Sequence, residues 1–355
     1  MITRKVDRQD ASPAGFTYTW VKKLGKNLEK LYVITWQESK TDDLPENIEI
    51  VSLTGNKWLK IFSIQKKLWK ILLEVNGVFC HQNPEYTILT GLLAKIFRKK
   101  IVSWYTHKAI SWRRYLMEIF ADKILTASDK SFRRPLFPKK VEITGHGIDI
   151  DYFTPVILKE QKITEESKRK FKILSVGRIS PAKDYTTLIA AIWGLVKQGK
   201  KDLEVQIIGQ PSLKSDQRYF RRIKQLVKKY HLGKYIKFLG PIPHNKILLY
   251  YQNCDLFVNL SQTGSIDKTV LEAMSCGRLV LTSNEAFIDV LGERLSFIIR
   301  LMFENKNPQD LAQKMINLMN LSKQEKKEIG KELRQKVVKN HNLDNLFKKI
   351  IFQFK

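Results

Sequence analysis

The sequence predicts an α/β protein of two doubly wound domains, each built around a parallel sheet. The 355 residues exceed the size at which a single hydrophobic core usually keeps growing. Short β-branched runs alternate with longer helical patterns, as is typical of parallel βαβ units. The series stops at a charged, exposed connector over Glu160–Lys170 and then starts again. We therefore place the domain boundary near residue 155.

The first half contains apolar runs of strand length. The opening run Met1–Asp7 is short for the central strand of a doubly wound domain, so either the start is trimmed or this strand is short. Further strands are predicted at Lys30–Trp36, Ile48–Leu53, Gly77–His81, Lys100–Tyr105, Lys123–Ala127 and Lys140–Thr144. Helical spacing predicts helices over residues 14–29, 57–75, 85–98 and 112–121.

The second half repeats the pattern. Strands are predicted at Lys172–Gly177, Leu203–Gly209, Tyr235–Gly240, Asp255–Leu260 and Arg278–Ser283, with a late one near Leu295–Arg300. Helices are predicted over 184–198, 215–231, 244–252, 267–276 and 308–319, and helical spacing continues from about 322 to the end.

Composition narrows the class of protein. Hydrophobic residues make up 43% and charged residues 28%, which is ordinary for a globular protein. Lys and Arg number 63 against 35 acidic residues, a formal net charge of +28 that favours polyanions such as nucleic acid, anionic lipid or phosphorylated ligands. A generally basic proteome is the alternative explanation.

Features of secreted, disulfide-linked and membrane-spanning proteins are not visible. The cysteines Cys80, Cys254 and Cys276 are few and scattered, so we expect reduced, buried thiols rather than disulfides or zinc ligands. The first residues show no secretory signal, and no apolar run approaches the roughly 20 residues that span a bilayer. We therefore expect a cytoplasmic protein, with peripheral attachment to the inner face of the membrane as an open alternative.

Two cations follow the first strand of the second half. The strand ends at Gly177, and Arg178 and Lys183 come just before the next helix. Ligands of doubly wound sheets bind beyond the carboxyl ends of the strands, and guanidinium and ammonium groups suit phosphate oxygens. The pair therefore predicts a pyrophosphate site, with two surface cations beside a turn as the alternative.

A second segment lies about ninety residues further on, where a strand leads through small residues into a helix starting near Asp267. Backbone N–H groups at a helix N-terminus bind phosphate, and Gly264 permits close approach of the backbone. Glu272 lies among apolar helix residues, where a carboxylate needs a partner. A ribose diol would serve, and a salt bridge to a neighbouring cation is the alternative.

Together the two segments resemble the donor-binding domain of the family-four retaining glycosyltransferases, which adopt the GT-B fold. Arg178 and Lys183 match the phosphate-contacting pair of that family, and Glu272 matches its ribose-binding second glutamate. Beside these matches, the helix N-terminus at Ser265–Lys268 is expected to bind phosphate through its backbone N–H groups. The stretch Phe238–Pro243, with Ile242, resembles the segment whose backbone contacts the base.

The resemblance continues through the N-terminal half. Gly15, after Asp10–Pro13, looks like the family's first glycine-bearing loop, and Trp104–Lys108 resembles the strand end that carries an active-site histidine. Gly145–Asp149 resembles the interdomain hinge. The resemblance therefore implies two Rossmann-like domains facing a central cleft: residues 1–155 bind acceptor, 156–335 bind the nucleotide-sugar donor, and a C-terminal helix over 336–355 returns to the N-terminal domain.

One position departs from the family. Its first glutamate, which contacts the transferred sugar, falls at Gly264 here, so the identity of the sugar is in question more than the nucleotide site. Asp267 and Lys268, one helical turn on, are candidates to recognise the sugar hydroxyls. An Asp267→Ala variant with unchanged donor preference would count against that hypothesis.

Three polar sites need a choice between function and structure. His107 is expected to contact a sugar hydroxyl or the acceptor, with a structural role as the alternative; His81 ends the preceding strand in the same way. The pair Asp149 and Asp151 matches the metal motif of metal-dependent glycosyltransferases only superficially, because it follows the hinge segment. We predict no metal and no further cofactor.

The helix over residues 57–75 combines tryptophan and other apolar residues with five lysines. Such basic amphipathic helices lie on anionic membranes, which would suit a lipid-linked acceptor at the cytoplasmic leaflet. A core-facing helix with a solvated lysine face is the alternative.

The residues predict a metal-independent glycosyltransferase of the hexosyltransferase type, and the resemblance implies that it retains the anomeric configuration. It would move sugar from a nucleotide-diphosphate sugar to a saccharide or lipid-linked acceptor, in the synthesis of cell-surface polysaccharide or glycolipid. Arg178, Lys183 and the helix N-terminus would stabilise the leaving diphosphate, and domain closure would exclude water. With no assignable carboxylate nucleophile, front-face attack is favoured over a covalent intermediate. The alternatives are a non-catalytic nucleotide-sugar binder, prompted by Gly264, a GT-B phosphorylase or epimerase, and a basic nucleic-acid-binding protein without a specific module.

Overall fold

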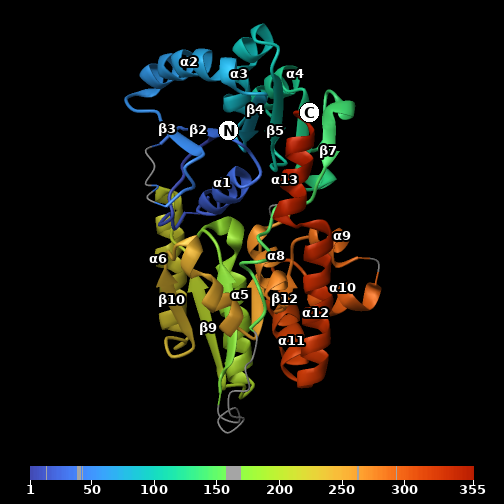
Figure 1. Cartoon of the computed structure of the whole chain (residues 1–355). Helices are drawn as coiled ribbons and strands as arrows, with labels where there is room; N and C mark the ends of the chain where they lie inside the picture. Colours follow the sequence, from blue (N-terminus) through green and yellow to red (C-terminus); the bar gives the residue numbers. More distant parts are fainter. Residues whose placement is uncertain (13, 38–40, 42, 157–168, 262–263, 293) are drawn as a thin grey trace. The chain divides into compact units, whose positions relative to one another are not determined.

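The computed structural model describes the chain except for residues 13, 38–40, 42, 157–168, 262–263 and 293, so most of the predicted connector lies outside the described residues (Figure 1). The chain divides into two compact units. Unit 1 holds Met1–Asp10, Ala14–Asp149 and Asn340–Lys355, and unit 2 holds Ile150–Lys339 together with the short stretch at Ala11 and Ser12. The chain therefore passes between the units directly after the Gly145–Asp149 segment and again before residue 340.

Unit 1 contains a parallel sheet of seven strands in the order β3-β2-β1-β4-β5-β6-β7. The strands are β1 (Ile2–Thr3), β2 (Leu31–Thr35), β3 (Ile48–Ser52), β4 (Gly77–His81), β5 (Lys100–Trp104), β6 (Lys123–Thr126) and β7 (Val141–Ile143). The helices are α1 (Thr17–Gly25), α2 (Lys57–Glu74), α3 (Pro84–Ile96), α4 (Trp112–Phe120) and α13 (Leu343–Phe352). The central strand β1 is only two residues long.

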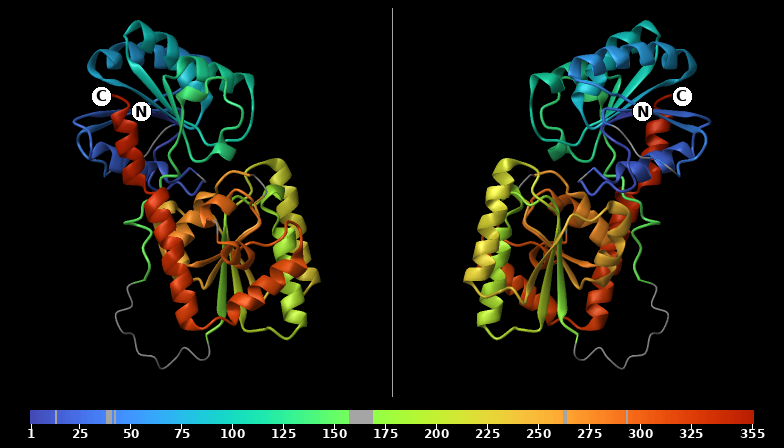
Figure 2. Two further views of the ribbon diagram at one scale, coloured as in Figure 1. Left: turned by 90° about the vertical axis from the view of Figure 1, so that its right-hand side faces the viewer. Right: turned by 90° about the vertical axis from the view of Figure 1, so that its left-hand side faces the viewer.

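Unit 2 contains a parallel sheet of five strands in the order β10-β9-β8-β11-β12. Its strands are β8 (Phe171–Val176), β9 (Leu203–Ile208), β10 (Ile236–Gly240), β11 (Leu256–Asn259) and β12 (Leu279–Thr282). Its helices are α5 (Tyr185–Lys197), α6 (Lys214–Lys229), α7 (Leu248–Asn253), α8 (Lys268–Ser275), α9 (Phe287–Leu291), α10 (Leu295–Leu301), α11 (Pro308–Met319) and α12 (Lys323–Asn340). Figure 2 shows helices on both faces of each sheet.

Side chains of each central strand supply both core layers, because successive residues point to opposite faces. In β4, Phe79 packs with residues of α1 and α13, whereas Val78 and Cys80 pack with residues of α2 and α3. Burial on both faces explains why these strands are nearly continuous apolar runs. The two parallel sheets covered by helices confirm the predicted α/β, doubly wound fold class.

The last helix completes the core of unit 1. Ile148 donates its N–H to the carbonyl of His341 at 2.7 Å, and Leu343 donates to the carbonyl of Ile148 at 2.9 Å. Gly145 has φ +74°, and a Cβ there would lie 1.8 Å from the carbonyl oxygen of Asn340. The crossing of these two segments therefore requires glycine at position 145.

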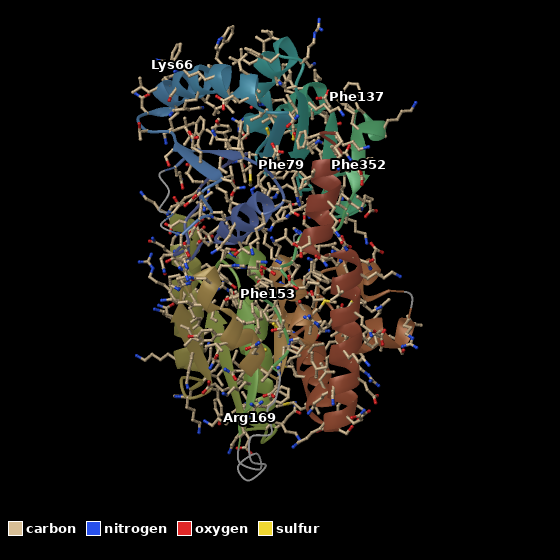
Figure 3. The ribbon with its side chains drawn as sticks, viewed as in Figure 1. Lys66, Phe79, Phe137, Phe153, Arg169 and Phe352 are labelled. Carbon is tan, nitrogen blue, oxygen red and sulfur yellow. The ribbon has the colours of Figure 1, made fainter. Side chains whose placement is uncertain are left out.

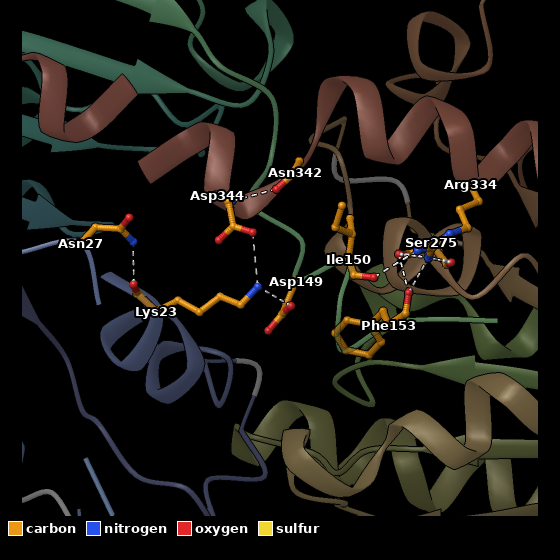
Figure 4. A network of polar contacts seen from close by, with 9 residues as sticks. All are labelled: Lys23, Asn27, Asp149, Ile150, Phe153, Ser275, Arg334, Asn342 and Asp344. Atoms are coloured by element: carbon orange, nitrogen blue, oxygen red, sulfur yellow. Dashed lines mark hydrogen bonds and ion pairs between the residues drawn. The ribbon is translucent and has the colours of Figure 1, made fainter. Parts of the chain in front are cut away.

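Polar contacts hold the residues before and after the point where the chain passes from unit 1 to unit 2, between Asp149 and Ile150 (Figure 4). Within unit 1, Lys23 Nζ lies 2.7 Å from Asp149 Oδ1. Within unit 2, the Arg334 guanidinium donates to the carbonyls of Phe153 at 2.8 Å and Ile150 at 3.2 Å. The start of unit 2 is thus bound to α12.

Two elements differ from the sequence-based expectation. The late strand near Leu295–Arg300 is wrong, because the residues form α10. Phe297 and Leu301, four residues apart, are buried, while Leu295 and Ile299 are exposed. In a short apolar run this helical spacing cannot be told from the alternation of a strand. The C-terminal helical stretch is two helices, because Asn342 accepts a hydrogen bond from the Asp344 N–H and caps α13.

Among the described residues, none of the helices combines the length and apolar character needed to cross a bilayer.

Candidate active site

The order of the strands in unit 2 defines a crevice. From β8 the sheet grows in one direction through β9 and β10, and in the other through β11 and β12. Neighbouring strands whose connections depart in opposite directions leave a crevice beyond their carboxyl ends, where doubly wound sheets bind ligands. Arg178 and Lys183 follow β8, and the loop that leads to α8 follows β11. The fold therefore brings both predicted segments to the switch point of the sheet.

Arg178 is held only loosely. Its side chain is 42% exposed, and its Nε lies 3.7 Å from Oδ2 of the buried Asp216. That same oxygen of Asp216 accepts hydrogen bonds from the backbone N–H groups of Ser212 and Leu213 before α6. The guanidinium therefore keeps donors available for another anion.

Lys183 and Asp267 form a direct ion pair. Lys183 Nζ lies 2.7 Å from Asp267 Oδ1, and both side chains are more than four-fifths buried. Asp267 Oδ2 also faces the amide nitrogens of Asn259 at 3.2 Å and Asn284 at 3.4 Å. The predicted phosphate-binding lysine and the residue predicted to recognise sugar hydroxyls thus form an ion pair with each other.

The start of α8 is shaped by glycine and asparagine. Gly264 is buried and has φ +64°, a left-handed conformation that favours glycine. The carbonyl of Ser265 accepts a hydrogen bond from Asn284 Nδ2 at 2.7 Å. Desolvation lowers the pKa of the half-buried Lys268 to about 7, while the charge of Glu272 acts in the opposite direction. This helix start therefore combines backbone N–H groups with an ammonium of reduced basicity.

Glu272 has protein partners on both carboxylate oxygens. Oε1 lies 3.0 Å from His244 Nε2, and Oε2 accepts a hydrogen bond from the Tyr251 hydroxyl at 2.8 Å. Burial and the adjacent carboxylate raise the pKa of Tyr251 well above its usual value, so the phenol remains a donor. The salt-bridge alternative is thus partly realised through a histidine, while each oxygen keeps a further lone pair.

Ile242 lies half-buried in the loop between β10 and His244. The imidazole of His244 stacks with the ring of Tyr152 at a centroid distance of 6.4 Å. The predicted base-contacting segment is therefore joined to Glu272 through His244.

Two predicted site residues belong to unit 1. Gly15 is buried in the turn before α1. His107 is exposed in the loop after β5, with its ring 5.5 Å from that of Tyr105. Desolvation by the surrounding chain lowers the pKa of His107, an effect that solvent exposure weakens. His81 is buried, with Nδ1 3.1 Å from the Thr3 hydroxyl.

No group of three or more His, Cys, Asp or Glu side chains within the described residues is arranged to hold a metal ion. Cys80, Cys254 and Cys276 are buried free thiols, and desolvation raises the pKa of Cys80 to about 11 and that of Cys254 to about 12.

The sequence reasoning missed the residues that hold the predicted ones in place. His244 and Tyr251 hold Glu272, while Asn259 and Asn284 hold Asp267. The asparagines carried a usable indication, since each stands at or just beyond the carboxyl end of a predicted apolar strand. His244 and Tyr251 carried none, because their pairing with Glu272 depends on how α7 and α8 pack.

Comparison with known proteins shows which family the chain resembles. The model of the family described as glycosyl transferases group 1 matches residues 156–340. A Saccharomyces cerevisiae protein named phosphatidylinositol N-acetylglucosaminyltransferase GPI3 subunit is 24% identical over 190 residues, covering 53% of this chain and 40% of that protein. A D-inositol 3-phosphate glycosyltransferase of Corynebacterium efficiens is 27% identical over 154 residues, covering 41% and 35%. The matched region thus spans well under half of these relatives.

Solved structures resemble the whole chain. A glycosyltransferase from Rickettsia africae superimposes with a TM-score of 0.75 at 19% identity, covering 100% of this chain and 97% of that one. The Anabaena protein HepE, solved in complex with UDP and glucose, gives a TM-score of 0.74 at 16% identity, covering 99% and 98%. Identities this low establish the fold alone.

The fold and the switch-point site define a protein of the GT-B class. The chain belongs to the glycosyl transferases group 1 family, whose model covers more than half of its length.

Proposed function

We propose that the protein is a retaining glycosyltransferase that takes a hexose from a nucleotide-diphosphate sugar. The observation that carries this proposal is the convergence of Arg178, Lys183 and the start of α8 at the switch point of unit 2. Arg178 and Lys183 bind the diphosphate, and Glu272 binds the ribose through its remaining lone pairs. The loop around Ile242 lies along the base.

Cationic groups replace a metal in this proposal. As the sugar–phosphate bond breaks, negative charge grows on the diphosphate, and fixed cations and helix N–H groups stabilise it. Binding requires Asp267 to release Lys183, because diphosphate and carboxylate compete for one ammonium. Once released, the Asp267 carboxylate is available to a sugar hydroxyl, which leaves the hydroxyl-recognition hypothesis open to test.

The acceptor is proposed to bind unit 1, with Gly15 and His107 as contacts. The exposed imidazole of His107 suits a hydrogen bond to a sugar or acceptor hydroxyl. The names of the two relatives from Saccharomyces cerevisiae and Corynebacterium efficiens both refer to an inositol compound. We therefore propose a saccharide or lipid-linked acceptor and include inositol phosphates in the acceptor panel.

A non-catalytic nucleotide-sugar binder is the second candidate. The observation that favours it is Gly264, which is buried, left-handed and lacks the carboxylate of the family's first glutamate. This candidate retains the diphosphate and ribose contacts but predicts no sugar release.

Nucleotide binding by calorimetry tests the site, with UDP, GDP, ADP and their common sugars as ligands. Arg178→Ala should weaken diphosphate binding, and Arg218→Ala, an exposed arginine on α6 of the same unit, is the matched control. A ligand at 100 times its dissociation constant also stabilises the fold by about 2.7 kcal/mol, which gives an independent thermal readout. If no nucleotide binds the wild type, or if both arginine variants bind alike, the proposed site is wrong.

Turnover separates the two candidates. Release of nucleoside diphosphate from the bound sugar, with or without acceptor, supports the transferase. Tight donor binding without any release across the acceptor panel supports the binder instead.

A further inference from the structure

Helix α2 carries a second apolar face that points into solvent. Trp58, Phe62, Trp69 and Leu73 are 71%, 75%, 55% and 68% exposed. Their spacings of four, seven and four residues align them along one side of an α-helix. The adjoining side of the helix, with Ile64, Leu68 and Leu72, already supplies the buried residues of α2 to the core. A surface helix of a globular protein is usually polar on its outer face, so core packing does not explain this stripe.

The apolar surface continues onto α3, which packs against α2 (Figure 1). The ring of Trp69 meets that of Phe97, at the end of α3, edge to face with centroids 5.1 Å apart. Leu92 and Ile96, one turn apart on α3, are 66% and 59% exposed. We call these residues together with the α2 stripe the outer face of unit 1. Contiguous exposed apolar surface of this kind marks an interaction site.

Positive charge surrounds the outer face. Lys66 and Lys70 on α2 and Lys95 and Arg98 at the end of α3 are exposed, and Figure 3 shows Lys66 extending from α2. The acidic residue at the end of this helix is Glu74. A ligand for this face must therefore accept aromatic and aliphatic side chains and carry negative charge.

We propose that the outer face binds an anionic lipid surface. Tryptophan, phenylalanine and leucine enter the boundary between headgroups and acyl chains, and the flanking lysines contact the phosphates. A second copy of the chain fits less well, because a symmetric interface would place the same cations against each other on two proteins of charge +28. The inference does not rest on the proposed sugar transfer, although it would bring unit 1 to a lipid-linked acceptor.

Vesicle flotation tests the proposal, with vesicles of phosphatidylcholine alone and of phosphatidylcholine mixed with phosphatidylglycerol. The wild type should float with the mixed vesicles only. Phe62→Ser should weaken partitioning about tenfold, as expected for withdrawing a large apolar side chain from the lipid boundary. Phe352→Ser is the matched control, because Phe352 is 69% exposed on α13 of the same unit, and it should float like the wild type.

A second pair of variants separates the effect of the lysines beside the outer face from the effect of the protein's net charge. Each lysine near an anionic surface strengthens binding about fivefold, so Lys66→Gln with Lys70→Gln should weaken it about 25-fold. Lys327→Gln with Lys331→Gln removes the same two charges at the same spacing from α12 and should change binding little. Circular dichroism and the thermal midpoint establish that every variant is folded.

Three results would overturn the proposal. If the two lysine pairs reduce vesicle binding equally, net charge alone attracts the protein. If Phe62→Ser binds vesicles as well as the wild type, the side chain does not insert into the lipid. If the wild type binds neither kind of vesicle but forms a dimer, and Phe62→Ser abolishes that dimer, then the outer face binds a second copy of the chain. Nucleotide binding measured on the same variants keeps this result distinct from the proposed function, because the outer face lies in unit 1 and the nucleotide site in unit 2.

Discussion

Replacement of Glu272 by alanine should destabilise unit 2 even when no ligand is present. Its side chain is 5% exposed and engages His244 at 3.0 Å and Tyr251 at 2.8 Å. Alanine leaves the buried phenol of Tyr251 without its acceptor. The same substitution is the obvious test of ribose binding, so its structural cost has to be known first.

The magnitude follows from two hydrogen bonds to a charged group. Each contributes about 1.5–3 kcal/mol, and a buried donor left unsatisfied costs its desolvation. The His244 contact is discounted, because its side chain is 17% exposed. Glu272→Ala should therefore lower the free energy of unfolding by about 3–5 kcal/mol. Glu272→Gln should cost about 1 kcal/mol, because the amide keeps the shape, accepts one hydrogen bond and donates to the Tyr251 hydroxyl.

Urea unfolding followed by circular dichroism measures the difference at constant slope. For a unit of this size, about 4 kcal/mol corresponds to a fall of roughly 10 °C in the thermal midpoint. Glu328→Ala on the exposed side of α12 is the control for loss of a glutamate from a helix. A double-mutant cycle with Tyr251→Phe isolates the energy of that hydrogen bond.

The reasoning fails if Glu272→Ala and Glu328→Ala unfold at the same urea concentration. A coupling energy near zero between Glu272→Ala and Tyr251→Phe would likewise exclude a stabilising contact. If the predicted costs are found, ribose binding has to be judged from Glu272→Gln rather than from alanine.

Three further predictions follow from single contacts. Burial lowers the pKa of His341 to about 4 from an unfolded value near 6.5, so the unfolded state binds the proton more readily. The free energy of unfolding should therefore fall by about 3 kcal/mol as pH drops from 6.5 to 4. Urea midpoints measured across that range check this, and His341→Asn should flatten the pH profile. Gly145→Ala, at φ +74° and 1.8 Å from the carbonyl oxygen of Asn340, should cost at least about 2 kcal/mol and make the α13 segment sensitive to proteolysis. Asp267→Asn should free Lys183 and tighten UDP about tenfold, as expected for removal of one nearby like charge; unchanged or weaker UDP binding by calorimetry would contradict the competition between carboxylate and diphosphate.

Elements with strong local patterns were predictable from the sequence. The strand Gly77–His81 and the helix Pro308–Met319 were predicted to the residue, since the first is a β-branched and aromatic run and the second begins with Asn307 and Pro308, a favourable cap and first position. The stretch Leu295–Leu301 was mistaken because a short apolar run fits either period. Only its burial, with one face covered and the other exposed, identifies α10 as a helix.

The candidate site was predictable only in part. The sequence indicates which residues reach the crevice, but not which of them form contacts with one another. Arg178 and Lys183 follow one strand, and both were placed correctly after β8 by chain position alone. The ion pair of Lys183 with Asp267 joins residues 84 positions apart. That contact exists because β8 and β11 are neighbours in the sheet, and strand order is a property of the whole domain.

The departure at Gly264 is a difference of backbone as well as of side chain. A left-handed φ of +64° costs a residue with a side chain about 1–2 kcal/mol, so Gly264→Glu would not simply restore the carboxylate of the family. Glycine allows this backbone conformation at position 264, and Asn284 holds the following carbonyl of Ser265. Conversely, Arg178, Lys183 and Glu272 are positioned by β8 and α8, not by this turn. The proposed diphosphate and ribose contacts therefore do not depend on the residue at position 264, whereas the proposed sugar contact does.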